Sequence, residues 1–208
     1  MPMPVAHSLI GATLVALSRR DLFLPFLPRI FSKDRTRAAK LRTGWLAVLW
    51  GAILGALPDI DLLLSWGFGW GVGVHGGFTH SVLFALAISA ALTLLRREVA
   101  WRPYAGYLGA ALSHGLLDAM TKDLFGGAAL LSPWVEEKVR WGILPNYAFY
   151  PNPAIQSWTS IAAEAWPYCR REFLLLAPLL IAILLVQCRR AEASIRPVSL
   201  PVQKSAGL

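Results

Sequence analysis

The sequence predicts an all-α protein, a polytopic bundle of about five membrane helices forming one domain over residues 1–190. Of its 208 residues, 56% are hydrophobic and only 15% are charged, and the mean hydropathy is +0.51. Soluble domains average about one quarter charged residues. Several apolar runs also approach the roughly 20 residues that a helix needs to cross a hydrocarbon core of about 30 Å. A membrane is therefore the expected solvent for much of the chain.

The apolar runs define the expected helices in chain order. They cover residues 5–17, 45–64, 78–95, 104–120 and 173–187. The first run is short for a full span, so a tilted or re-entrant segment is a second interpretation of it. No basic residue precedes that run and no small-residue cleavage site follows it, so we expect the segment to stay in the protein and not to act as a removable signal peptide.

Basic residues orient the predicted helices. A loop at residues 19–43 is rich in Lys and Arg, and the positive-inside rule places it in the cytoplasm. Alternation then puts residues 65–77 and 121–172 outside and the basic tail at 191–208, predicted to be disordered, inside. The expected location is a bacterial inner (cell) membrane. The net charge of +8 is explained by these inner loops beside anionic lipid, so no nucleic-acid partner is expected.

The long outer segment before the last helix is rich in aromatic residues. They include Trp134, Trp141, Tyr147, Tyr150, Trp158, Trp166 and Tyr168. Such residues are typical of the headgroup level, so membrane lipid is the expected partner. Simple interfacial anchoring is favoured over a lipid-binding wall. Cys169 and Cys188 flank the last apolar run too far apart to form a disulfide.

All four histidines and three aspartates fall at the outer ends of the predicted helices. They are His7, Asp59, Asp61, His75, His80, His114 and Asp118. Each has an ordinary explanation: interfacial carboxylates near Pro58, loop or cap histidines at residues 75–80, and a private hydrogen bond between His114 and Asp118. The last two are four residues apart and share one face of an apolar helix, where unpartnered polar groups are costly.

The combination favours a shared metal, because imidazole nitrogens and carboxylate oxygens are the ligands of zinc, manganese and iron. One or two divalent ions are expected, zinc first. The predicted metal ligands are His7, Asp59, Asp61, His80, His114 and Asp118. Asp61 and His75 are the predicted catalytic residues, since seven candidates exceed one tetrahedral shell and some of them should orient ligands or act as a base.

Two other chemistries are disfavoured. The glycine run at residues 67–77 lacks the Gly-Lys-Ser/Thr ending of a phosphate loop, so it is interpreted as a pliable outer loop. Ser8 and Ser113 each adjoin a histidine, but neighbouring residues on a helix point about 100° apart and cannot form a nucleophile and base pair directly.

With these residues assembled, the chain resembles the YdjM-type family of inner-membrane, metal-dependent hydrolases, also described as LexA-binding. The resemblance covers roughly residues 5–135. It runs through His7–Gly11, Leu57–Asp61, His75–Ser81, Ser113–Asp118 with Thr121, and Leu131–Pro133. It implies a zinc-dependent, phosphoesterase-like activity. The family pattern commonly has an arginine where this chain has Gly76. If that arginine binds a substrate anion in the family, the role is vacant here or taken by another basic residue.

The sequence thus predicts a membrane-bound hydrolase that attacks an ester or phosphoester, with a lipid-like substrate, by means of water activated by the metal. Two alternatives stay open. A metal-ion or proton transporter also uses intramembrane His and Asp residues, although it would want ligands near the midplane. A non-catalytic membrane scaffold is the other.

Overall fold

The computed structural model describes residues 4–19, 35–68, 75–122, 127–144 and 157–195. Within these ranges the regular elements are helices and no β-strand forms, as predicted. The elements are α1 (Pro4–Ser18), α2 (Arg35–Ala56), η2 (Leu57–Asp59), α3 (Ile60–Phe68), η4 (Phe78–His80), α4 (Val82–Leu95), α5 (Trp101–Met120) and α6 (Trp158–Ile195), of which η2 and η4 are 3₁₀ turns.

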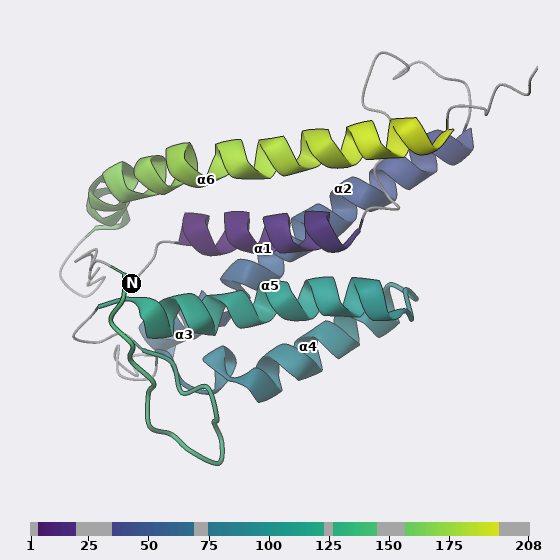
Figure 1. The fold of residues 1–208 in the computed structure, drawn as a ribbon. Coiled ribbons are helices and arrows are strands. Elements are labelled where there is room, and N and C mark those ends of the chain that lie inside the picture. The colour runs from purple at the N-terminus through teal and green to yellow at the C-terminus, as the bar shows by residue number, and fades with distance from the viewer. Residues whose placement is uncertain (1–3, 20–34, 69–74, 123–126, 145–156, 196–208) are drawn as a thin grey trace, which may run out of the picture.

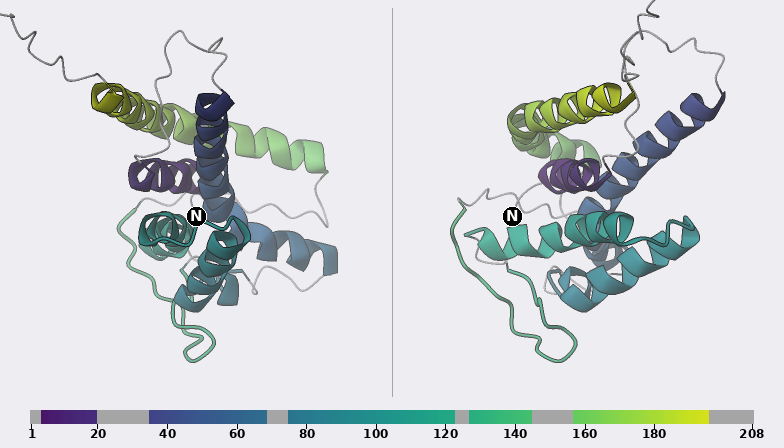
Figure 2. Two further views of the ribbon diagram at one scale, coloured as in Figure 1. Left: turned by 90° about the vertical axis from the view of Figure 1, so that its right-hand side faces the viewer. Right: turned by 45° about the vertical axis from the view of Figure 1, so that its right-hand side comes forward.

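Helix α1 lies at the centre of the bundle. It contacts α2, α5 and α6, while α4 packs on α5 and α2 crosses the layer obliquely (Figures 1 and 2). The chain runs from left to right in Figure 1 along α1, α4 and α6, and from right to left along α2 and α5. The starts of α1 and α4 and the end of α5 therefore lie at the same end of the bundle.

Glycines allow α1 and α2 to approach very closely. A Cβ atom on Gly55 would lie 2.2 Å from the carbonyl oxygen of His7, and one on Gly11 would lie 2.3 Å from the carbonyl oxygen of Gly51. Small residues at such spacing are typical of helix pairs in membranes, where close backbone packing replaces the hydrophobic effect. This contact, which we call the glycine seam, is formed by Gly11, Gly51 and Gly55 and brings the start of α1 against the end of α2.

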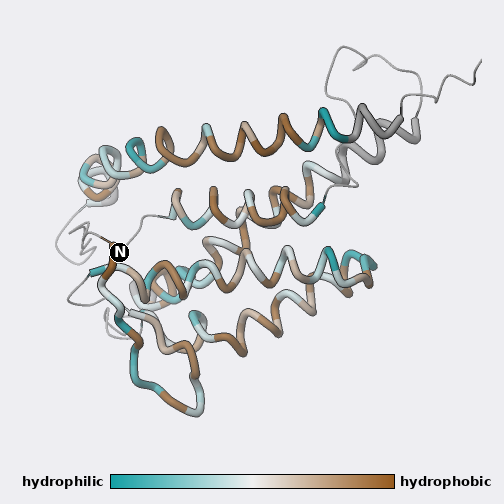
Figure 3. The backbone as a smooth tube through the Cα atoms, in the orientation of Figure 1, coloured by the Kyte–Doolittle hydropathy of each residue, from teal (hydrophilic) through white to brown (hydrophobic). Residues whose placement is uncertain are grey.

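Two helices are long and apolar enough to cross a membrane, Gly44–Ser65 and Thr159–Arg190; Pro4–Ser18 and Val82–Leu95 are shorter apolar helices. The long helix α6 is hydrophobic along much of its length (Figure 3). Several of its apolar side chains are exposed: Leu174 and Leu175 are each 65% exposed. A continuous apolar face of this kind suits contact with lipid and not with water.

Two predicted helices differ from the observed ones. The predicted segment at residues 45–64 is broken at η2, where Pro58 cannot donate a backbone hydrogen bond, and continues as α3. Helix α6 begins at Trp158, before the predicted start at residue 173, and extends to Ile195, past the predicted start of the tail. Residues 20–34 of the basic loop, residues 69–74 of the glycine run, Tyr147, Tyr150 and residues 196–208 lie outside the described residues.

The end of α1 meets the α4–α5 connection in an ionic cluster that we call the arginine network: Arg19, Arg96, Glu98 and Tyr107. Arg19 Nη1 donates to Glu98 Oε2 at 2.6 Å, Tyr107 donates to the same oxygen at 3.0 Å, and Arg96 Nη2 donates to Oε1 at 2.9 Å. Burial raises the pKa of Glu98, but the hydrogen bonds from Arg96 and Arg19 outweigh this effect and leave the pKa below its usual value.

Candidate metal centre

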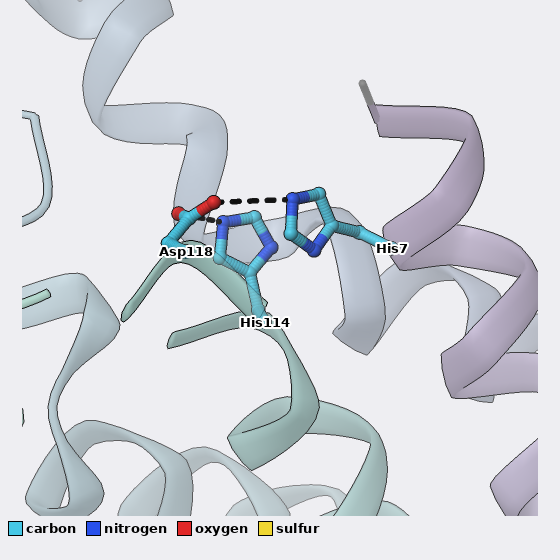
Figure 4. A group of neighbouring side chains, drawn as sticks. All are labelled: His7, His114 and Asp118. Atoms are coloured by element: carbon cyan, nitrogen blue, oxygen red, sulfur yellow. Dashed lines mark ion pairs between the residues drawn. The ribbon is translucent and has the colours of Figure 1, made fainter. Parts of the chain in front are cut away.

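The structure brings all seven predicted site residues together at the other end of the bundle, in what we call the histidine cluster. His7 comes from α1 and Asp59 from η2, while Asp61 lies in the first turn of α3. His75 lies in the following loop, His80 ends η4, and His114 and Asp118 lie near the end of α5. Figure 4 shows His7 and His114 pointing toward Asp118.

Four ligand atoms converge at the centre of the histidine cluster. His80 Nε2 lies 3.1 Å from His114 Nε2 and 3.2 Å from Asp118 Oδ2. His114 Nε2 lies 3.4 Å from the same Asp118 oxygen and 3.3 Å from Asp59 Oδ1. Side chains from η2, η4 and α5 thus meet around one point.

The hydrogen bonds of the two central histidines fix which nitrogen faces that point. His114 Nδ1 lies 2.6 Å from the carbonyl oxygen of Gly55, which can only accept, so Nδ1 carries the proton. The Thr79 hydroxyl donates to Asp61 at 2.8 Å and therefore accepts from His80 Nδ1 at 3.0 Å. In the neutral rings both Nε2 atoms then carry lone pairs. Two lone pairs facing each other need a cation or a proton between them.

Several buried polar atoms at this point have no hydrogen-bond partner among the described residues. They are both carboxylate oxygens of Asp59 and of Asp118, and both ring nitrogens of His7. Leaving a buried polar group unsatisfied costs about 1–3 kcal/mol, and more for a charged group. A bound cation would satisfy several of them at once, so the donor set fits a metal ion.

The spacing also fits a small tetrahedral ion. Zinc bound by nitrogen and oxygen at about 2.0–2.1 Å places neighbouring ligand atoms about 3.3–3.4 Å apart, because that is the edge of such a tetrahedron. Four of the six separations among these atoms run from 3.1 to 3.4 Å. His80, His114, Asp59 and Asp118 could therefore hold one ion with little movement.

Three overlapping groups of possible ligands share the central histidines. They are His7, His114 and Asp118; Asp59, His80 and His114; and Asp61, His75 and His80. His7 stacks on His114 with ring centroids 3.8 Å apart, and its Nε2 lies 3.5 Å from Asp118 Oδ1. A second ion could use this side of the cluster.

Asp61 is the hydrogen-bonding hub on the opposite side. It accepts from His75 Nδ1 at 2.8 Å, from Thr79 at 2.8 Å and from the backbone of Gly76 at 3.3 Å, and it lies 3.4 Å from His80 Nδ1. A carboxylate placed behind a metal-binding histidine orients the ring and raises its basicity. This arrangement suits a carboxylate that orients His80.

The two loop histidines differ in their protonation. Burial lowers the pKa of His75, but its hydrogen bond to Asp61 and the negative charges of Asp61, Asp118 and Asp59 together outweigh burial and leave the pKa raised. Burial lowers the pKa of His80, and this effect prevails over its contacts with Asp118. His80 is therefore neutral at neutral pH and available as a ligand, whereas His75 is suited to hold a proton.

Sequence reasoning missed three supporting groups: the Gly55 carbonyl, the Thr79 hydroxyl and Glu172 of α6. Glu172 Oε2 accepts from the backbone nitrogen of Ala6 at 3.1 Å and so holds the first turn of α1, which carries His7. A carboxylate inside a helix that enters an apolar run is the signal that could have drawn attention to Glu172.

The fold and the cluster define a helical membrane protein with a buried His/Asp centre. The comparisons with known proteins place it more narrowly. A family model described as YdjM inner membrane protein matches residues 1–194, so the chain belongs to the YdjM family, as the resemblance predicted.

One curated relative supports the membrane location. The "Inner membrane protein YbcI" of Escherichia coli (strain K12) is 36% identical over 97 residues, covering 42% of this chain and 54% of the relative. The chain thus matches about half the length of that protein. No solved structure matches the chain.

Proposed function

We propose that the protein is a membrane-bound, metal-dependent hydrolase of an ester or phosphoester. The observation that supports it most is that possible ligand atoms of His80, His114, Asp59 and Asp118 lie close together, with four of their six separations near the edge length of a zinc tetrahedron. The buried acceptors without hydrogen-bond partners point the same way. Zinc is the proposed ion, with manganese or iron as alternatives.

Each residue has a proposed part. His80, His114 and Asp118 hold the ion, and their side chains are 0–3% exposed. The Asp59 side chain is the most open of the four, at 11% exposed, although its two oxygens are buried. When bound, the ion would make water a stronger nucleophile and polarise the ester. His75 and Asp61, joined by a 2.8 Å hydrogen bond, would hold and pass the proton.

The proposed setting is a multi-pass bundle with the histidine cluster on the extracytoplasmic side. The chain direction alternates between successive long helices (Figure 1), and the arginine network lies at the end that the positive-inside rule assigns to the cytoplasm. Exposed aromatic residues beside the cluster, such as Trp134, support a substrate that resides in the membrane surface.

The hydrolase proposal is tested with detergent-purified protein and a panel of phosphoesters and lipid esters. We expect cleavage that is lost with chelator and restored by zinc or manganese, and reduced turnover in Asp61→Asn. Ion flux in proteoliposomes that is abolished by His114→Ala, with no cleavage of any ester, would instead support a transporter.

Orientation is tested by cysteine labelling from outside intact cells. The structure offers two exposed positions at opposite ends of the bundle, Trp134 and Val99, which are 75% and 77% exposed. In a background without Cys169 and Cys188, we expect Trp134→Cys to be labelled and Val99→Cys to be protected. The reverse pattern would invert the proposed topology.

A further inference from the structure

A segment outside the helices is fixed across the histidine cluster. Residues 127–144 are attached to the His75 loop, where Ala129 N donates to the carbonyl oxygen of Gly76 at 2.8 Å. They are also attached to the end of α5, where Trp141 N donates to the carbonyl oxygen of Ala119 at 2.6 Å. Side chains of this segment are therefore held in place next to the proposed metal ligands.

Lys138 is the cation of that segment that comes nearest to the cluster. Its ammonium group donates to the carbonyl oxygen of His75. A Cβ atom on Gly76 would lie 3.4 Å from Lys138 Nζ, and the backbone nitrogen of Gly76 donates to Asp61 Oδ2 at 3.3 Å. The ammonium group of Lys138 thus lies next to Gly76, the residue whose backbone nitrogen donates to Asp61.

The same lysine lines a cavity of about 350 Å³. The cavity walls are Leu131, Val135, Glu137, Lys138, Val139 and Arg140. This lining combines two cations and one carboxylate with three apolar side chains. Burial and the nearby charge of Arg140 lower the pKa of Lys138, while Asp61 acts in the opposite direction. An anion between the two cations would offset their repulsion.

Apolar groups continue from the cavity to the surface. Leu131 is 57% exposed, Val135 is 44% exposed and Trp134, between them in this stretch of chain, is 75% exposed. A pocket with a charged end and an apolar, aromatic edge is suited to an amphiphile whose anionic group enters first.

We propose that Lys138 binds the anionic group of an amphiphilic phosphoester beside the metal centre, with Leu131 and Val135 receiving the start of its apolar chain. The assignment rests on the proposed hydrolase function, for which it names the substrate class. Lys138 Nζ has donors beyond the one directed at His75, since an ammonium group carries three. It can therefore hold the loop and the substrate together.

The test measures binding without turnover. Hexylphosphonate, which has no ester bond to cleave, is titrated by calorimetry into zinc-loaded, detergent-purified full-length protein. We expect Lys138→Met to weaken its binding at least about tenfold, because a charge-assisted hydrogen bond is lost. Lys138→Arg should restore most of the affinity. Lys122→Met is the matched control, because Lys122 packs near Gly142 of the same segment but does not line the cavity.

The outcomes distinguish an anion subsite at Lys138 from a structural tether and from a purely polar pocket. Unchanged affinity in Lys138→Met, or an equal loss in Lys122→Met, would overturn the subsite. A loss of zinc from Lys138→Met would show a structural tether instead. Inorganic phosphate that binds as tightly as hexylphosphonate would overturn the apolar part of the assignment. If Lys138→Met loses phosphonate while the wild-type protein cleaves no ester, the subsite stands and the hydrolase proposal fails.

Discussion

The two polar clusters of this bundle both contain buried charged groups but differ in whether their carboxylate oxygens receive hydrogen bonds. In the arginine network both oxygens of Glu98 receive hydrogen bonds from Arg19, Arg96 and Tyr107. In the histidine cluster the oxygens of Asp59 and Asp118 lie buried without such donors among the described residues. The unmatched atoms of the histidine cluster include carboxylate oxygens, whereas both carboxylate oxygens of the arginine network are matched by donors.

This difference separates a structural cluster from a binding site. A set of charges that only holds helices together can supply donors for its own carboxylate, as the arginine network does for Glu98. A set that gathers lone pairs at 3.1–3.4 Å needs a cation or an added proton from outside. Unpaired acceptors, and not the mere presence of buried charge, distinguish the candidate metal site.

The largest expected effect is the loss of bound zinc when the histidine cluster is changed and the arginine network is left intact. The double variant His114→Ala, Asp118→Ala deletes two central ligands, so zinc content should fall at least about tenfold by elemental analysis of purified protein. Glu98→Gln, at the other end, should keep its zinc. A loss of zinc from Glu98→Gln with retention in the double variant would reverse our assignment of the two clusters.

Metal addition should stabilise the folded protein through the histidine cluster. A ligand that binds only the native state at about 100 times its Kd contributes about 2.7 kcal/mol. For a chain of this size we expect the Tm to rise by about 5–10 °C when zinc is added after chelation, if unfolding in detergent follows the usual scaling. His114→Ala should show little rise. Equal responses in the two proteins would contradict the site.

The glycine seam should link stability to metal binding. Gly55→Ala places a methyl group 2.2 Å from the His7 carbonyl oxygen, so overpacking should cost about 1–3 kcal/mol and lower the affinity for zinc. Gly109→Ala is the matched control, because its nearest neighbour, Leu14 Cδ1, would lie 3.8 Å away. Thermal unfolding and zinc titration of both variants check this; equal behaviour would show that the seam tolerates a side chain.

The smallest expected effect concerns pH at the arginine network. The pKa of Glu98 is lower in the folded state than its ordinary value of 4.5. Its contribution to folding stability is therefore fully present above pH 4.5 and is lost as the pH falls through the pKa of the folded state. Chelated wild-type protein should therefore lose stability below about pH 4.5 more steeply than Glu98→Gln. Parallel pH curves would show that the network contributes nothing to acid sensitivity.

The helical class and the positions of the polar residues could be predicted because both leave local signals. Apolar runs mark helices, and a histidine or aspartate inside such a run is too costly to be accidental. The early start of α6 left no such signal, since Glu164, Arg170 and Arg171 lower its hydropathy. The seven predicted residues meet in the structure, but their roles as ligands or catalysts stay predictions.

The supporting contacts could not be predicted, because they join residues far apart in the chain. Gly55 and His114 are separated by 59 positions, His75 and Lys138 by 63, and Ala6 and Glu172 by 166. Nothing local at Lys138 or Glu172 indicates its partner. Only the packing of the helices determines which carbonyl or backbone nitrogen stands opposite each side chain.

The contact between Glu172 and the start of α1 has a mechanical consequence. Helix α6 has the largest share of exposed surface of the candidate spans, so bilayer thickness would set its tilt more directly than that of the others. Its Glu172 is bonded to Ala6, the residue immediately before His7. A change in the slope of this helix would therefore reach a candidate ligand through that hydrogen bond as well as through the packing of α6 on α1, which would make lipid composition a physical variable of the site.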